Sequence, residues 1–261
     1  MKSLLVAFQF LTHIPVPLKA VTERDMGRSS VWFPVVGALL GTFLCAFYHV
    51  VGQHFPETLA RVLTLVALIL VSGAFHLDGL SDTVDGFYGG SDRDKALEIM
   101  RDPRAGAMGV IAIVCGLFLK GAVFLTLSAK DLKSALLVMP VVGHAAMVLS
   151  FSLPSVRPDG LCHIFSEHRH RWDGLAALIM AGAACGCVIG PAGLKALAAA
   201  LLGTVLLLGM SWRKIRGVTG DVCGAANEVA EICFLLGFMA ALPVMAPGAV
   251  DVDAYLPQWM R

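Results

Sequence analysis

Three aspartates within eight residues could hold a metal ion at a membrane boundary. Asp78, Asp82 and Asp85 follow an apolar run over residues 62–75. On a helix, positions four, three and seven apart share a face, so the three carboxylates would lie within an arc of roughly 60°. Three oxygen donors with no cysteine or histidine pair suit a hard cation such as Mg²⁺. A loop of solvated acids is the alternative, but the helical register favours the metal site.

His76 precedes these aspartates and leaves two alternatives open. The imidazole could orient an aspartate or contact a substrate, or it could be a hydrogen-bonded structural histidine. Gly79 and Gly86 place no side chain beside the carboxylates, which would let a ligand approach the backbone closely.

A second polar run, over residues 93–109, could bind phosphate. Arg93, Arg101 and Arg104 would supply planar donors that match phosphate oxygens. Asp102 could complete the metal shell. Ordinary positive charge in a cytoplasmic loop explains the same arginines without chemistry, but a neighbouring acidic metal site favours phosphate binding.

A third polar group opens the last apolar segment. Asp221, Glu228 and Glu231 are separated by seven and three residues, which again places them on one helical face, and Asn227 lies among them. Acids within a span are costly and usually functional. The alternative is a pair of acids neutralised by loop arginines.

The composition indicates a membrane protein. Of the 261 residues, 57% are hydrophobic and 15% are charged, whereas soluble domains carry about 25% charged residues. The apolar residues come in blocks of about 20, long enough to span a bilayer. The net charge of +1 gives no basic footprint for nucleic acid. The seven cysteines lie mostly in apolar runs without zinc-site spacing, which predicts reduced thiols.

The predicted fold is all-α: a polytopic integral membrane bundle of about seven transmembrane helices, forming one domain over residues 1–261. Residues 3–14 form a segment too short to span, which predicts a re-entrant or interfacial helix. The tail from 243 to 261 is expected at the surface. The predicted spans are 31–51, 61–75, 107–127, 134–153, 175–190, 196–212 and 222–242.

Lysine and arginine are unevenly distributed between alternate loops. The loops near 18–30, 76–106, 154–173 and 213–221 hold thirteen of them, whereas the opposite set holds five. Because positive charge stays cytoplasmic, these four loops and the candidate site are expected at the cytoplasmic face of a bacterial inner membrane. The 154–173 loop, rich in histidine and arginine, is itself predicted to be solvated.

The pattern resembles the cobalamin synthase family, the adenosylcobinamide-GDP ribazoletransferases. Residues 75–86 resemble the family signature, and residues 97–106 are similar to the run that follows it. Residues 219–231 resemble the family's last helix, and 10–17 and 33–37 give weaker matches. This chain has His144 and Cys162 where the family commonly has arginine and glycine, so no role is transferred to these two positions.

The resemblance implies a reaction. The family joins α-ribazole, or its 5′-phosphate, to adenosylcobinamide-GDP, giving adenosylcobalamin or its 5′-phosphate and releasing GMP. A ribose hydroxyl attacks a pyrophosphate phosphorus, which requires a charge clamp and an aligned nucleophile. Mg²⁺ would neutralise the pyrophosphate. The predicted catalytic residues are Asp82, Asp85, Asp221 and Glu228, the predicted substrate contacts are His76, Arg93, Arg101, Arg104, Asn227 and Glu231, and the predicted metal ligands are Asp78, Asp82, Asp85 and Asp102.

Two other functions fit part of the pattern. The spacing of Asp82, Asp85 and Gly86 also occurs in CDP-alcohol phosphotransferases, although the rest of that pattern is missing here. A membrane cation transporter would place acids near the midplane and show an internal repeat, whereas the acids are expected at the cytoplasmic ends and no repeat is evident. Membrane lipid is an expected partner, and a homo-oligomer or association with other corrinoid-assembly enzymes is compatible with the sequence.

Overall fold

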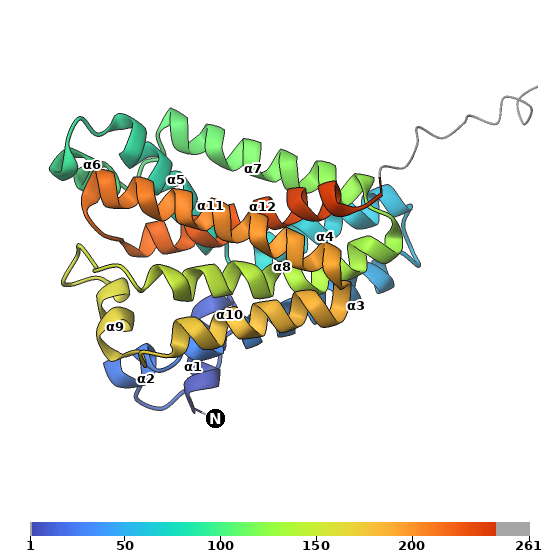
Figure 1. Ribbon diagram of the computed structural model, residues 1–261, viewed down its shortest axis with the longest axis horizontal. Helices are drawn as coiled ribbons and strands as arrows, with labels where there is room; N and C mark the ends of the chain where they lie inside the picture. Colours follow the sequence, from blue (N-terminus) through green and yellow to red (C-terminus); the bar gives the residue numbers. More distant parts are fainter. Residues whose placement is uncertain (1, 244–261) are drawn as a thin grey trace, which may run out of the picture.

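The computed structural model describes residues 2–243, and their secondary structure is helical except for an isolated bridge between Ser155 and Val218. Most long helices run along the long axis of the molecule (Figure 1). The helices are α1 Lys2–Leu11, α2 Glu23–Gly27, η1 Ser30–Trp32, α3 Phe33–Val51, α4 Glu57–Val71, α5 Phe75–Gly89, α6 Arg93–Ile99, α7 Ala107–Thr126, α8 Ala129–Ser150, α9 Leu161–His168, α10 Asp173–Ala184, η2 Cys185–Ile189, α11 Pro191–Ile215 and α12 Gly220–Ala241.

Helix α8 lies at the centre of the bundle. It packs against α3, α10 and α12, and α12 packs in turn against α5 and α11. Small residues permit these close approaches, as is usual between helices in membranes. A Cβ atom at Gly37 of α3, for example, would lie 2.5 Å from the carbonyl oxygen of Pro140 in α8.

The outer faces of the bundle are apolar, as expected for a surface in contact with lipid. Phe118 of α7 is 74% exposed, and Leu202 and Val205 of α11 are more than half exposed. Five helices are long and apolar enough to cross a membrane, and the number rises to seven if each of two bent helix pairs is one span. The predicted all-α membrane bundle of about seven spans is therefore confirmed.

The first bent pair is α4 and α5, which meet at 81°. Gly73 and Ala74 both have positive φ, at 61° and 57°, and this left-handed pair turns the chain. The span predicted over 61–75 therefore ends at Val71, and the acidic stretch follows as a helix of its own.

The second bent pair, α9 with α10 and η2, meets at 96° and corrects a prediction. The 154–173 loop was expected to be solvated, but it contains α9. Phe165 is 1% exposed and Cys162 is 2% exposed, so one face of α9 packs into the core. Two apolar residues at helical spacing, 162 and 165, account for this burial.

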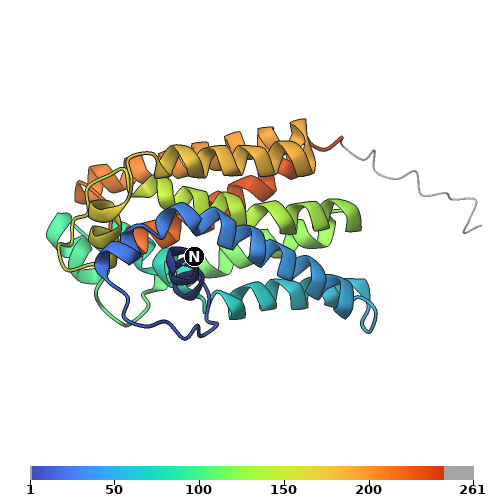
Figure 2. The same cartoon turned by 90° about the horizontal axis from the view of Figure 1, so that it is seen from below.

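The helix boundaries otherwise follow the predicted spans to within a few residues. Helix α8 begins at Ala129, ahead of the predicted 134, because the Ser128 side chain caps it by accepting a hydrogen bond from the Asp131 N–H. Helix α1 has ten residues, about 15 Å of helix. It runs across the bundle axis in Figure 1 and is seen nearly end-on in Figure 2. It is too short to span, as predicted. The tail was predicted to lie at the surface, but its residues from 244 onward are outside the part of the chain that the structure describes.

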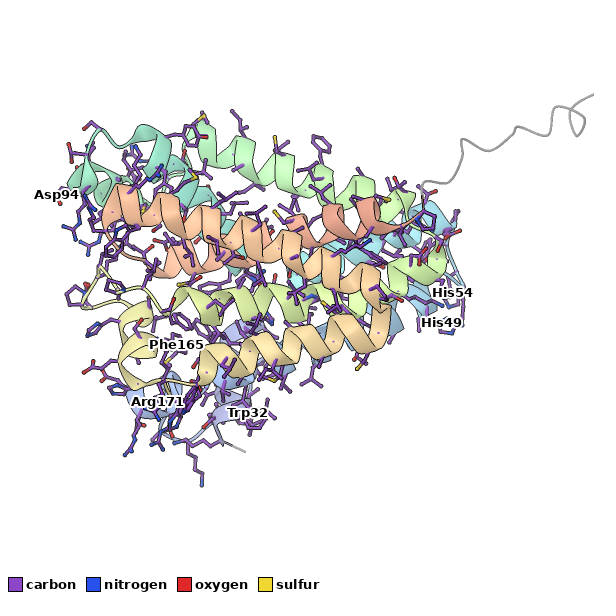
Figure 3. The ribbon with its side chains drawn as sticks, in the orientation of Figure 1. Trp32, His49, His54, Asp94, Phe165 and Arg171 are labelled. Carbon is purple, nitrogen blue, oxygen red and sulfur yellow. The ribbon has the colours of Figure 1, made fainter. Side chains whose placement is uncertain are left out.

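The four loops rich in lysine and arginine gather at one end of the bundle (Figure 1). The bridge between Ser155 and Val218 joins two of them, and Lys214 Nζ lies 3.5 Å from the carbonyl oxygen of Gly90 in a third. Helix α2 packs against α9. In Figure 3, Asp94 lies at this end and His54 at the other. The predicted common side is confirmed, while its identity as the cytoplasmic side stays a prediction.

Candidate active site

The candidate site is built where α5 crosses α12 with their backbones in contact. A Cβ atom at Gly79 would lie 2.7 Å from the carbonyl oxygen of Asp221 and 3.2 Å from Cα of Gly224. The missing side chain lets the first turn of α12 lie directly against α5. This crossing brings Asp221 beside the aspartates of α5, although more than a hundred residues separate them in the sequence.

Four carboxylates meet at this crossing. Asp78, Asp221 and Asp85 lie near enough to Asp82 for their charges to act on it, and so does the guanidinium group of Arg157. Asp78 is exposed, and Asp82 is partly buried. The predicted helix over the acidic stretch is confirmed. Such a concentration of negative charge beside one arginine is a strong attractor for cations.

Asp85 holds the following loop against α5. Its two carboxylate oxygens accept hydrogen bonds from the backbone N–H groups of Gly106 and Gly109, at 2.7 and 2.8 Å. The carboxylate thus caps the N-terminus of α7, where the helix dipole favours negative charge. A side chain at either glycine would collide with this carboxylate. The geometry gives Asp85 a positioning role, while its predicted catalytic and metal-binding roles stay predictions.

Asp102 and Arg104 form an exposed pair on that loop. Arg104 donates from Nε and Nη2 to the two carboxylate oxygens, at 2.9 and 2.7 Å. These bonds, with one from the Arg104 backbone N–H, lower the pKa of Asp102 to about 2. Both side chains line an open cleft of about 470 Å³ that Asp85 and Gly106 also line. Asp102 therefore shares a cleft with Asp85, but its oxygens are engaged with Arg104.

The other two predicted phosphate-binding arginines lie at the same end of the bundle. Arg93 donates from Nε to the carbonyl oxygen of Ile215, at 3.0 Å, and so fastens α6 to the end of α11. Arg101 is largely exposed, with Nη2 3.8 Å from a carboxylate oxygen of Asp159. Arg101 is therefore accessible to a ligand, whereas Arg93 is partly committed to the fold.

Arg157 was not predicted as a site residue, and it is the arginine at the centre of the cluster. Its Nη1 donates to Oδ2 of Asp221 at 2.9 Å, and Thr219 Oγ1 donates to the same oxygen at 3.1 Å. The Arg157 side chain is 16% exposed. The residue precedes a Pro158-Asp159-Gly160 turn, and that turn was its one signal in the sequence.

A cavity of about 190 Å³ opens beside this pair. Its polar lining includes Asp78, Arg157 and Asp221, and its apolar lining includes phenylalanines of α1, α5 and α9 and Phe151. The cavity thus joins a charged edge to an aromatic interior. Pockets of this kind, apolar with a few convergent polar groups, are the usual form of small-molecule sites.

The acids in the middle of α12 belong to a different cluster. Lys120 Nζ of α7 donates to Glu228 Oε2 at 2.7 Å and to Glu231 Oε2 at 2.5 Å. Asn227 Nδ2 donates to the other oxygen of Glu231 at 3.3 Å. All four side chains are buried. The expectation that these acids lie at the cytoplasmic end, with loop arginines as the alternative neutralising partner, is therefore wrong for Glu228 and Glu231.

His76 belongs to this buried cluster as well. Within the described part of the chain, its Nε2 has no hydrogen-bond partner. Its ring centroid lies 5.5 Å from that of His144, whose Nδ1 is 3.1 Å from the carbonyl oxygen of Phe33. His76, Lys120, Asn227, Glu228 and Glu231 line one small internal cavity. The structure therefore separates these predicted site residues from the carboxylates at the α5–α12 crossing.

Comparison with known proteins assigns the chain to a family. A family model described as cobalamin-5-phosphate synthase matches residues 3–239. The chain belongs to the cobalamin-5-phosphate synthase family. An adenosylcobinamide-GDP ribazoletransferase of Pseudomonas syringae pv. syringae (strain B728a) is 37% identical over 234 residues, covering 88% of this chain and 96% of that protein. A protein of the same name from Pseudomonas entomophila (strain L48) is 38% identical over 237 residues, covering 89% and 96%. No solved structure matches the chain.

Membership of the cobalamin-5-phosphate synthase family confirms the resemblance seen in the sequence. It rules out the two alternatives, a CDP-alcohol phosphotransferase and a membrane cation transporter. It also gives the signature a structural explanation. Asp85 of the signature and Gly106 of the later run meet in one hydrogen bond. The two motifs are adjacent in space because Asp85 of the signature caps helix α7, which begins directly after Gly106 of the later run.

The carboxylate oxygens at the site of this cobalamin-5-phosphate synthase family member are chemically suitable ligands for Mg²⁺. Among residues 2–243, no group of three or more His, Cys, Asp or Glu side chains is gathered tightly enough to hold a metal. Magnesium, however, is usually bound by one or two carboxylates together with substrate phosphates and water. Asp85 and Asp102 are engaged elsewhere, which leaves Asp78 and Asp82 as the carboxylates best suited to such a site.

Proposed function

We propose that this chain joins α-ribazole or its 5′-phosphate to adenosylcobinamide-GDP and releases GMP. The observation that carries the proposal is the meeting of Asp78, Asp221 and Arg157 at the edge of an amphipathic cavity. Asp82, on the same helix as Asp78, lies near enough for their charges to act on it. The relatives that match over nearly the whole chain are named adenosylcobinamide-GDP ribazoletransferases. A phosphoryl-type transfer needs this combination of charge neutralisation and alignment.

In the proposed reaction, a hydroxyl oxygen of the ribose attacks one phosphorus of the pyrophosphate. An oxygen–phosphorus bond forms, the bond to the bridging oxygen breaks, and GMP leaves with that electron pair. Arg157 and the exposed Arg101 bind phosphate oxygens, since guanidinium groups match their geometry. Asp221, which Arg157 and Thr219 hold in place, is positioned to orient the hydroxyl and take its proton. Glu228, paired with Lys120, supports the fold.

Mg²⁺ is the proposed cofactor, with Asp78 and Asp82 as its protein ligands. When bound, it would neutralise negative charge on the pyrophosphate and on the leaving GMP. The partial burial of Asp82 among other carboxylates supports this assignment, because a cation relieves their mutual repulsion.

Turnover by the purified protein tests both proposals. In detergent with adenosylcobinamide-GDP and α-ribazole, the protein is expected to release GMP with Mg²⁺, to stop in EDTA and to recover when Mg²⁺ is restored in excess. Full turnover in EDTA would contradict the metal, and absence of GMP release with Mg²⁺ from folded protein would contradict the activity.

The site is proposed to face the cytoplasm from a bacterial inner membrane. The support is the excess of lysine and arginine in the loops around it. Reporter fusions within 129–133 and within 154–173 should report opposite sides, with 154–173 cytoplasmic. A periplasmic signal from 154–173 would reverse the orientation. The predicted homo-oligomer and association with other corrinoid-assembly enzymes stay predictions.

A further inference from the structure

The cavity beside the carboxylates has the size of an aromatic ring system. Its volume is about 190 Å³, whereas an apolar cavity of about 150 Å³ in another protein holds a benzene molecule. A planar base of one or two fused rings would therefore fill it. The GDP-bearing corrinoid would not fit inside, because its macrocycle is far larger than this space.

The interior of the cavity is lined by aromatic rings that belong to one cluster. The rings of Phe151 and Phe165 stack with centroids 5.0 Å apart, and Phe10 lies 5.0 Å from Phe165 and 5.4 Å from Phe75. Aromatic side chains offer nucleobases faces on which to stack. Phe165 is labelled in Figure 3, where it points into the bundle near the charged end. The interior thus suits a flat, weakly polar ring.

The charged edge suits the other half of a nucleoside. Asp78, Arg157 and Asp221 line the cavity together with the aromatic rings. A nucleoside whose base enters the aromatic interior would leave its ribose hydroxyls beside the carboxylates, and a 5′-phosphate would meet Arg157. An acyl chain of a lipid would match the interior but would gain nothing from two aspartates at the edge.

We infer that this cavity receives the base of the nucleoside acceptor, and that Met147 and Cys162 limit the size of base that it admits. The inference rests on the proposed function and adds the place where the acceptor binds. Both side chains line the cavity and are 2% exposed. Neither carries a strong hydrogen-bonding group, so this part of the wall selects by shape.

Two substitutions of opposite effect test the inference. Cys162→Met reduces the cavity, and the KM for α-ribazole should rise by about tenfold or more, because one methylene in an apolar pocket has an effect of that order. The KM for adenosylcobinamide-GDP should stay within about twofold. Met147→Ala enlarges the cavity and should shift kcat/KM toward a nucleoside with a larger, tricyclic base. Leu149→Ala is the control, because Leu149 is on the same helix and lines a separate cavity.

Several outcomes would overturn the inference. They are an unchanged KM for α-ribazole in both variants, an equal rise in the KM of both substrates, or a base preference that Leu149→Ala shifts as much as Met147→Ala does. Phospholipid retained by the wild type and lost from Cys162→Met, without a change in α-ribazole binding, would make the cavity a lipid site. If Cys162→Met fails to fold, the base preference of Met147→Ala decides the matter.

Equilibrium binding of α-ribazole alone separates this inference from the proposed function. If the wild type binds α-ribazole and Cys162→Met binds it about tenfold more weakly, the cavity assignment holds even where no GMP is released. If the wild type releases GMP but the cavity variants bind α-ribazole normally, the proposed function holds and the cavity assignment fails.

Discussion

Asp82→Asn should lower kcat by about 10³-fold while the chain remains folded in the membrane. Asp82 is partly buried and lies among three other carboxylates with Arg157 as the nearby cation. Asparagine keeps the shape but removes the charge, so the proposed Mg²⁺ ligand is lost. The folded chain should not suffer, because removing one of several like charges relieves repulsion. Release of GMP in detergent measures the effect, and gel filtration reports the fold.

Asp94→Asn is the matched control for that experiment. Asp94 lies at the same end of the molecule, on α6, and its side chain is 90% exposed. The substitution removes the same charge from outside the cluster, and turnover should stay near that of the wild type. Near-normal turnover of Asp82→Asn, or an equal loss in Asp94→Asn, would remove Asp82 from the reaction.

Sequence periodicity predicted the helix that carries the aspartates of the site. The spacing of Asp78, Asp82 and Asp85 gave a helix, and the structure has α5 at that place. The loop charges placed the polar segments on one side, and they lie at one end of the bundle (Figure 1). Both inferences depend on local sequence or on summed charge, which need no knowledge of packing.

The partners of the charged side chains could not be read from the sequence. Periodicity placed Asp221, Glu228 and Glu231 on one face of a helix, but it does not tell how deep each lies or what packs opposite. The contact of Gly79 with α12 places Asp221 at the site. Lys120 on α7 forms ion pairs with Glu228 and Glu231. A lone lysine in an apolar helix, such as Lys120, requires a buried partner, but its sequence position does not identify that partner.

Lys120→Met should be the most destabilising of these substitutions. Lys120 is buried and bonded to both glutamates, so its loss leaves two carboxylates in the interior without a cation. Breaking a buried ion pair in this way costs about 3–5 kcal/mol. The midpoint of thermal unfolding in detergent should fall sharply, and little protein should survive purification. Lys130→Met, at the exposed start of α8, should leave the midpoint unchanged.

Removing all three charges together distinguishes a structural cluster from a catalytic one. In Lys120→Met combined with Glu228→Gln and Glu231→Gln, no buried charge lacks a partner, and neutral replacements of buried ion networks are often tolerated. The thermal midpoint should recover most of its loss, and turnover should return with it, because the reaction depends on the carboxylates at the α5–α12 crossing. A triple variant that is stable yet inactive would show that Glu228 takes part in the reaction. A triple variant that stays unstable would show that the hydrogen bonds of this network, and not only the balance of its charges, hold α7 to α12.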